Sequence, residues 1–147
     1  MKNKELMLGN FVYDDPVKGF PMYVTGIFDD VVYLDFDGNE GDVWEVNEND
    51  LAPIVVTEEL LNKMNFSENQ DAGMTIFEYS LNNSKFMITI NNLSNHKDKD
   101  WYAHIDNEAF ETIGGFDFQY VHELQNGIMT ITGEEFPIDK NIFWKNE

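Results

Sequence analysis

The chain has 147 residues, of which 28 are acidic and 9 basic, and its formal net charge at pH 7 is −19. This length fits one domain or two small lobes that share a core, and with 42% hydrophobic and 14% aromatic residues we expect it to fold despite its charge. It has no cysteine, which excludes disulfides, thiolate nucleophiles, cysteine-ligated zinc and iron–sulfur clusters, and it has no apolar run typical of a membrane span or secretion signal, so we expect a cytoplasmic protein without membrane contact.

The basic residues are unusual in kind and in position. All nine are lysines, so bidentate guanidinium contacts to phosphate or guanine are excluded. Between Lys18 and Lys63 the chain has eleven acidic residues and no basic one. A nucleic acid approaching this segment would be repelled over a Debye length of about 8 Å. We therefore expect no direct nucleic-acid binding, and we interpret the acidity either as a solubilising coat or as a surface that attracts a basic protein.

The first third of the chain alternates short β-branched and aromatic segments with turns. These segments predict five antiparallel strands, at residues 10–13, 22–28, 31–36, 43–46 and 50–54. Asp29-Asp30 predicts a tight hairpin turn, because acidic residues tolerate the positive φ of such turns. Five short strands in fewer than fifty residues are typical of a small SH3-like antiparallel β-barrel, which we place at residues 5–56.

The remaining residues, 57–147, predict a second lobe of helices and strands. Thr57 is expected to cap a short helix that extends to Phe66, and the polar residues 67–73 predict a loop or a lobe boundary. The following pattern predicts strands at 74–81, 85–91, 101–105 and 109–113.

A longer helix and a tail complete this lobe. Apolar residues at helical spacing predict a helix over 118–132 that ends at Gly133, and Gly127 weakens it by about 1 kcal/mol relative to alanine. The C-terminal tail, from residue 136 to 144, predicts an edge strand, because Pro137 cannot donate a ladder hydrogen bond. The fold class is thus α+β: a barrel lobe, a helix, and a second antiparallel sheet packed on the longer helix.

The segment from Asp35 to Glu45 begins like a calcium-binding loop, with side-chain oxygens at alternating positions. Counted from Asp35, the glycine of position 6 is replaced by Glu40, and the bidentate acid of position 12 is replaced by Val46. We therefore expect a hairpin with solvated carboxylates, and no metal or other cofactor.

The residues that usually carry catalysis do not form a known pattern. His96, His104 and His122 have no metal-binding spacing, and the sequence contains neither a Gly-x-Ser-x-Gly elbow nor a phosphate-binding glycine loop. His122 and Asn126 lie one helical turn apart, an arrangement that more often satisfies hydrogen bonds than transfers protons.

Recognition of a partner protein is the remaining role for the acidic and aromatic residues. Tryptophan and tyrosine are enriched in protein interfaces, and a platform of Trp44, Trp101, Trp144, Tyr102 and Phe116 without nearby bases suits a protein better than a nucleic acid. The candidate partner-binding residues are Asp35, Asp37, Asp42, Trp44, Glu45, Trp101 and Tyr102.

Three stretches of the sequence point to a family. They are residues 6–12 (Leu-Met-Leu-Gly-Asn-Phe-Val), 51–61 (Leu-Ala-Pro-Ile-Val-Val-Thr-Glu-Glu-Leu-Leu) and 120–135, which holds Val-His-Glu-Leu-Gln-Asn and Thr-Gly-Glu-Glu. In order and spacing they resemble an uncharacterised family of short proteins from gut Bacteroidales and their phages and mobile elements. The resemblance implies no activity, and the motif residues His122, Gln125 and Asn126 are read as structural. The chain departs from the family pattern at Met7, where that pattern has arginine, and at Gly127, where it has a larger apolar residue.

Three functional hypotheses follow. The leading one is a non-enzymatic accessory protein, of phage or mobile-element type, whose acidic face binds a basic protein. An alternative is a DNA mimic that inhibits a nucleic-acid-binding protein of the host, which predicts carboxylates spaced like phosphates along one face. Another is a small hydrolase that uses a carboxylate with His122 or His104, which predicts that both groups meet within about 3 Å in a pocket.

Overall fold

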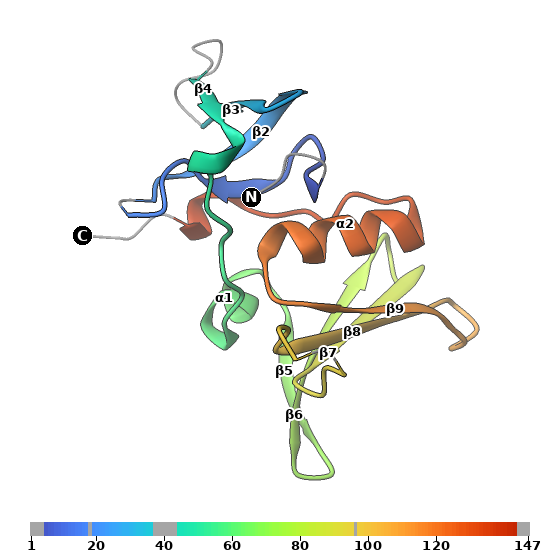
Figure 1. Cartoon of the computed structure of the whole chain (residues 1–147). Coiled ribbons are helices and arrows are strands. Elements are labelled where there is room, and N and C mark those ends of the chain that lie inside the picture. Colours follow the sequence, from blue (N-terminus) through green and yellow to red (C-terminus); the bar gives the residue numbers. More distant parts are fainter. Residues whose placement is uncertain (1–4, 18, 37–43, 96, 144–147) are drawn as a thin grey trace. The chain divides into compact units, whose positions relative to one another are not determined.

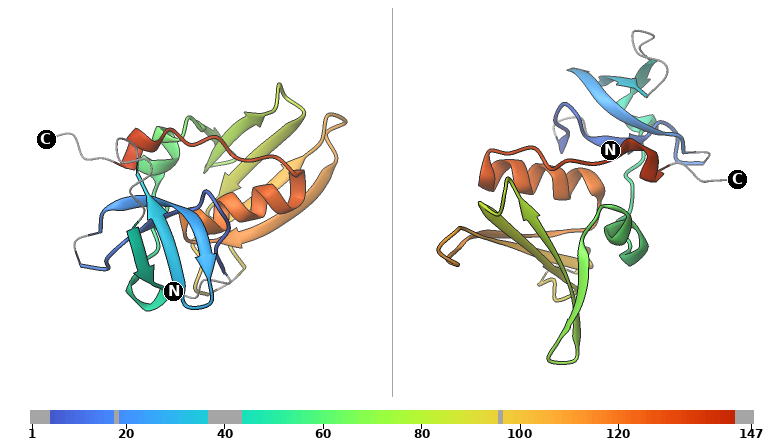
Figure 2. Two further views of the ribbon diagram at one scale, coloured as in Figure 1. Left: turned by 90° about the horizontal axis from the view of Figure 1, so that it is seen from above. Right: turned by 180° about the vertical axis from the view of Figure 1, so that it is seen from behind.

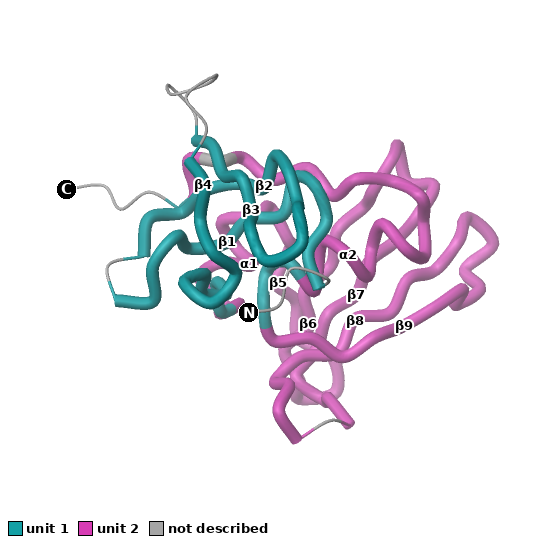
Figure 3. The backbone as a smooth tube through the Cα atoms, turned by 45° about the horizontal axis from the view of Figure 1, so that its top comes forward, with its two compact units in different colours: residues 1–55, 120–122, 143–147 teal, residues 56–119, 123–142 magenta. Residues whose placement is uncertain are grey.

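The computed structural model describes residues 5–17, 19–36, 44–95 and 97–143. They form an α+β fold with two antiparallel sheets, of four and five strands, which confirms the predicted fold class at this level. The chain divides into two compact units, coloured separately in Figure 3. Unit 1 comprises residues 1–55, 120–122 and 143–147, and unit 2 comprises residues 56–119 and 123–142. The predicted division into 5–56 and 57–147 did not assign residues 120–122 and 143–147 to the first unit.

Unit 1 is built on a four-stranded sheet in the order β1-β2-β3-β4. The strands are β1 (Phe11–Tyr13), β2 (Pro21–Phe28), β3 (Val31–Asp35) and β4 (Trp44–Asn47), close to the predicted segments. Asp29 adopts φ 33°, as the predicted hairpin turn between β2 and β3 requires. The buried core comprises Leu6, Val12, Met22, Val24, Val32, Leu34 and Leu51.

The segment predicted as a fifth strand, 50–54, is not a continuous strand. The 3-10 helix η2 (Glu48–Asp50) takes up its first residue, with Asn47 as its N-cap. The chain then makes an isolated bridge between Ala52 and Tyr13. The next residue, Pro53, has no N–H group to extend the pairing.

Two later segments of the chain belong to unit 1. The backbone N–H of Val121 donates to the carbonyl of Ile54 at 2.9 Å, and Tyr120 forms an isolated bridge with Val55. The ring of Phe143 packs against Phe11, with ring centroids 4.8 Å apart.

Unit 2 contains a five-stranded antiparallel meander in the order β5-β6-β7-β8-β9. Its strands are β5 (Ser67–Asp71), β6 (Met74–Leu81), β7 (Phe86–Asn91), β8 (Trp101–Asp106) and β9 (Thr112–Phe118). The predicted strands corresponding to β6, β7 and β8 are confirmed to within one residue at each end.

One face of this sheet is buried beneath helix α2 (Val121–Thr132), which lies along it in Figure 1 and Figure 2. We call this the inner face. Its fully buried side chains occupy alternate positions of β7 and β8, and α2 contributes the equally buried Leu124 and Ile128. The inner side chains with no exposed surface are Phe77, Ile88, Ile90, Ala103, Ile105 and Phe118.

The short helix α1 (Glu58–Lys63) begins as predicted. The Oγ1 atom of Thr57 accepts a hydrogen bond from the backbone N–H of Leu60 at 3.1 Å, which identifies Thr57 as the N-cap. Gly133 ends α2 with φ 73°, again as predicted.

The predicted loop at 67–73 is wrong, because most of it forms β5. Every residue of β5 is exposed, so this strand lacks the alternation of apolar residues by which strands are recognised. It is held by backbone pairing to β6 and by polar cross-strand pairs, such as Asn69 with Glu78 at 2.8 Å. Ala72 and Gly73 both adopt positive φ in the two-residue turn between these strands.

The predictions for 109–120 also need correction. Strand β9 runs from Thr112 to Phe118, through Gly114 and Gly115, and α2 begins at Val121 instead of residue 118. The two glycines remain in the strand because they pair with Ile105 and His104 of β8, and side chains lie over both positions. A Cβ on Gly114 would lie 2.8 Å from Cδ1 of Ile131, and a Cβ on Gly115 would lie 2.2 Å from the hydroxyl of Tyr102.

The predicted tail strand at 136–144 is wrong within the described residues, which end at 143. Residues 135–139 pair with no strand, and the 3-10 helix η3 (Lys140–Phe143) follows. Asp139 stabilises the start of this helix, because its carboxylate accepts from the N–H of Asn141 at 3.0 Å.

Candidate functional site

The partner-binding candidates of unit 1 differ in their accessibility. Asp35 is only 6% exposed, and its carboxylate accepts from the N–H of Phe36 at 2.8 Å, so it supports the end of β3. Trp44 is 46% exposed and contacts Phe36 edge-on, and Glu45 beside it is exposed. Asp37 and Asp42 lie outside the described residues, as does the centre of the calcium-like loop.

The two candidates of unit 2, Trp101 and Tyr102, lie on opposite faces of β8, because successive side chains of a strand alternate. Trp101 is buried on the inner face, and its Nε1–H donates to the carbonyl of Val56 at 3.1 Å. It also lines a pocket of about 360 Å³ with Phe77 and the exposed Leu93. Trp101 and Tyr102 therefore do not form one platform, and Trp144 lies outside the described residues.

The three motif residues of α2 lie at its N-terminal half. His122 is 2% exposed, and its ring stacks on that of Tyr120 with centroids 5.8 Å apart. Gln125 is buried, and Asn126 is half-buried. The structural role expected for these residues stays a prediction.

A histidine and a carboxylate lie near each other on β8. The Nε2 atom of His104 is 3.9 Å from an Oδ atom of Asp106, whose other oxygen accepts from the hydroxyl of Thr112 at 2.7 Å. Both side chains are partly exposed on the strand, and neither lines either of the two pockets described here. The separation is longer than a hydrogen bond, so His104 and Asp106 lack the contact of about 3 Å that the hydrolase hypothesis predicts for this histidine.

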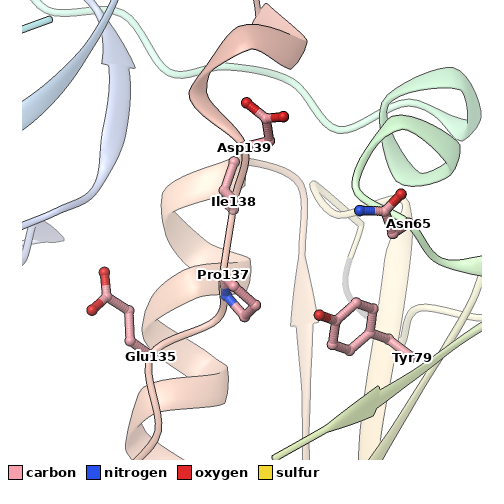
Figure 4. Close-up of a pocket in the computed structure, with 6 residues that line it drawn as sticks. All are labelled: Asn65, Tyr79, Glu135, Pro137, Ile138 and Asp139. Atoms are coloured by element: carbon pink, nitrogen blue, oxygen red, sulfur yellow. The ribbon is translucent and has the colours of Figure 1, made fainter. Parts of the chain in front are cut away.

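A pocket with a volume of about 520 Å³ belongs to unit 2. We call it the Tyr79 pocket. In Figure 4, Tyr79 and Asn65 lie on one side, and the segment that follows α2 lies on the other. The residues that line it are Asn65, Tyr79, Glu135, Pro137, Ile138 and Asp139.

Local structure fixes both walls of this pocket. Asn65 follows α1 with φ 72°, a conformation that asparagine tolerates better than most residues, and its N–H donates to the carbonyl of Asn62. Tyr79 projects from β6 on the inner face. The opposite wall begins just after Gly133 and ends at Asp139, which caps η3.

An aromatic cluster holds the two walls together. The ring of Phe136, which is 2% exposed, packs on Tyr79 with centroids 4.9 Å apart and on Phe66 with centroids 5.5 Å apart. Phe66 and Tyr79 are 5.4 Å apart, so the three rings form a closed set of contacts. The ring of Tyr79 and the segment of Phe136 are thus fixed before any ligand binds.

The charge of the pocket is negative. The carboxylates of Glu135 and Asp139 lie at the two ends of the 135–139 wall, with Pro137 and Ile138 between them, and none of the six described lining residues is basic. Across the described parts of the chain, no three histidine, aspartate or glutamate side chains are grouped so that they could hold a metal ion. A site with carboxylate, amide and phenol oxygens beside apolar surface suits a cationic group on an aliphatic stem.

None of the six lining residues was a candidate from the sequence. Asn65 and Tyr79 are far from residues 135–139 along the chain, and the packing of Phe136 on Phe66 and Tyr79 brings these segments together. The one local signal was Pro137 between acidic residues, which indicated an exposed, extended segment.

Comparison of the chain with protein-family models, curated proteins and solved structures found no match. The helices of the described residues include none with the length and apolar character needed to cross a bilayer.

Proposed function

We propose that this protein is a non-enzymatic binding protein for a basic protein partner, and that the Tyr79 pocket receives a lysine or arginine side chain of that partner. The observation that carries the proposal is a preformed pocket of about 520 Å³ whose described lining residues include two carboxylates and no basic side chain. Its volume falls in the range of about 300–1,000 Å³ typical of ligand sites.

The net charge of the chain also supports a basic partner. A charge of −19 attracts basic partners over a long range and repels nucleic acids, so association depends on ionic strength. A basic side chain could lay its aliphatic stem along Ile138 and Pro137 while its head group reaches Asp139 or the hydroxyl of Tyr79.

The test uses acetyl-Gly-Lys-Gly-amide, a probe with one ammonium group, titrated into the full-length protein and followed by NMR. We expect saturable shifts at Asn65, Tyr79 and Ile138. These shifts should be lost with the same peptide carrying norleucine, which keeps the stem without the charge. They should also be lost in the double variant Glu135→Gln/Asp139→Asn.

The matched control is Asp30→Asn/Asp50→Asn, which removes the same charge from exposed positions of unit 1. If both double variants reduce the shifts equally, the probe follows overall charge and the proposed site is wrong. Equal shifts with the norleucine peptide would contradict the need for a cation.

The finer architecture of unit 1 and the origin of the chain remain predictions. We infer an SH3-like barrel, because reciprocal hydrogen bonds between Tyr13 and Ala52, at 2.8 and 3.0 Å, add a neighbour to β1 just after η2. Slow hydrogen exchange at these two amides would support closure of the barrel, and exchange as fast as in loops would oppose it.

The neighbouring genes would test the predicted phage or mobile-element context. Displacement of a captured partner by DNA would distinguish the DNA-mimic alternative.

A further inference from the structure

The face of the five-stranded sheet opposite α2 forms a second surface, which we call the outer face. Its positions alternate with the buried inner positions and follow the strand register, in which Glu78 pairs with Thr89, Thr89 with His104, and His104 with Gly115. The apolar and acidic side chains of this face include Ile76, Glu78, Met87, Tyr102, Asp106 and Asp117.

The charged side chains that the strands place on the outer face are acidic. The strands β5 to β9 contain no lysine, and they place the carboxylates of Glu78, Asp106 and Asp117 on this face. Each of these carboxylates accepts a hydrogen bond from an uncharged donor: the amide of Asn69 at 2.8 Å, the hydroxyl of Thr112 at 2.7 Å and the backbone N–H of Asn95 at 3.3 Å, respectively. These donors orient the carboxylates without neutralising them, so their field extends outward.

The same face also has apolar surface. Ile76, Met87 and Tyr102 are half-buried on it. The hydroxyl end of the Tyr102 ring lies over Gly115, where an added Cβ would be 2.2 Å from it. The ring therefore spreads across β9 and presents a flat aromatic surface. Tyrosine and methionine with surrounding polar groups are typical of protein interfaces.

We propose that the outer face is a docking surface for a segment of a protein partner in which lysine or arginine residues flank apolar side chains. Charge complementarity argues for this occupant, because the strands that carry the apolar side chains add three carboxylates and no lysine to this face. It argues against a second copy of this chain, which would bring like charges together. The inference shares with the proposed function the basic class of the partner, but it concerns a different surface.

The test uses a fluorescein-labelled nine-residue peptide, Lys-Lys-Ile-Lys-Lys-Ile-Lys-Lys-Lys, and measures its Kd for the full-length protein by fluorescence anisotropy. The variant Glu78→Gln/Asp106→Asn/Asp117→Asn should weaken binding by about tenfold, as several close charge pairs are lost together. Asp30→Asn/Asp50→Asn/Glu108→Gln removes the same charge from exposed positions elsewhere and should weaken it by less than about twofold. Near-UV circular dichroism of both variants checks that they fold.

A second variant, Tyr102→Ala, leaves the charge unchanged and should also weaken binding, by about fivefold. Equal Kd values for the two triple variants, or full affinity in Tyr102→Ala, would overturn the inference. The Glu135→Gln/Asp139→Asn variant separates the two proposals. If it alone abolishes binding, the outer face is not the docking surface. If it loses only the single-lysine shifts while the outer-face variant loses the nine-residue peptide, both proposals stand.

Discussion

Gly127 offers a test in which packing and helix propensity predict opposite signs. It lies within α2, where the ring of Phe116 from β9 packs against the helix backbone. A Cβ added to Gly127 would lie 2.4–2.5 Å from the Cζ, Cε1 and Cε2 atoms of that ring. Carbon atoms in contact are about 3.5–4.0 Å apart, so the ring would have to move by about 1 Å.

The expected effect follows from two opposing terms. Alanine in place of glycine stabilises a helix interior by about 1 kcal/mol. Overpacking costs about 1–3 kcal/mol, because neighbouring side chains leave their preferred rotamers. We therefore expect Gly127→Ala to lower the free energy of unfolding by about 1 kcal/mol and the Tm by about 3 °C. Urea and thermal unfolding, followed by circular dichroism, measure both quantities.

Two controls isolate the packing term. Thr130→Ala, at an exposed position of the same helix, should stabilise the protein by about 0.5 kcal/mol, because it replaces a β-branched residue without a clash. In a Phe116→Ala background the clash is removed, and Gly127→Ala should then stabilise by about 1 kcal/mol. The reasoning is refuted if Gly127→Ala stabilises the wild-type protein as much as it stabilises Phe116→Ala.

Three further changes test individual contacts. Thr57→Ala removes the acceptor for the N–H of Leu60 and should cost about 1 kcal/mol in urea unfolding, whereas Thr57→Ser should cost little; equal losses would argue against capping. Ile128 has no exposed surface, so Ile128→Ala should lower the free energy of unfolding by about 2–5 kcal/mol and Ile128→Val by about 0.5–1.5 kcal/mol. A loss below about 1 kcal/mol for alanine would contradict the place of Ile128 in the core. Gly115→Ala should displace the ring of Tyr102, which NMR would detect as shifted ring resonances; unchanged resonances would show that the ring does not cover this glycine.

Elements with strong local signals were predictable from the sequence. Strands β2, β3, β6 and β7 have β-branched and aromatic residues bounded by turns, and Thr57 and Gly133 are residue types that caps favour. Strand β5 was missed because it has no buried side chain. Backbone pairing to β6 keeps it extended. Such a strand has no local sequence signal.

The candidate sites were less predictable, since they depend on contacts distant in sequence. The alternation that placed Trp101 and Tyr102 in a strand also separates them, one into the core and one onto the outer face. The pair Gly114-Gly115 indicated a break by composition, whereas pairing of both glycines with β8 keeps the strand continuous. The Tyr79 pocket depends on the Phe66–Phe136 contact between residues seventy positions apart.

The central claim is that the acidic surface of this chain recognises a partner at defined places. The most direct measurement is the amide shift map of the full-length protein titrated with the nine-residue lysine and isoleucine peptide at 0.15 M salt. We predict saturable shifts concentrated in β6, β7 and β8 and around Asn65 and Ile138. Weak shifts spread over exposed carboxylates of both units, with no saturation, would contradict the claim and leave the charge as a solubilising coat.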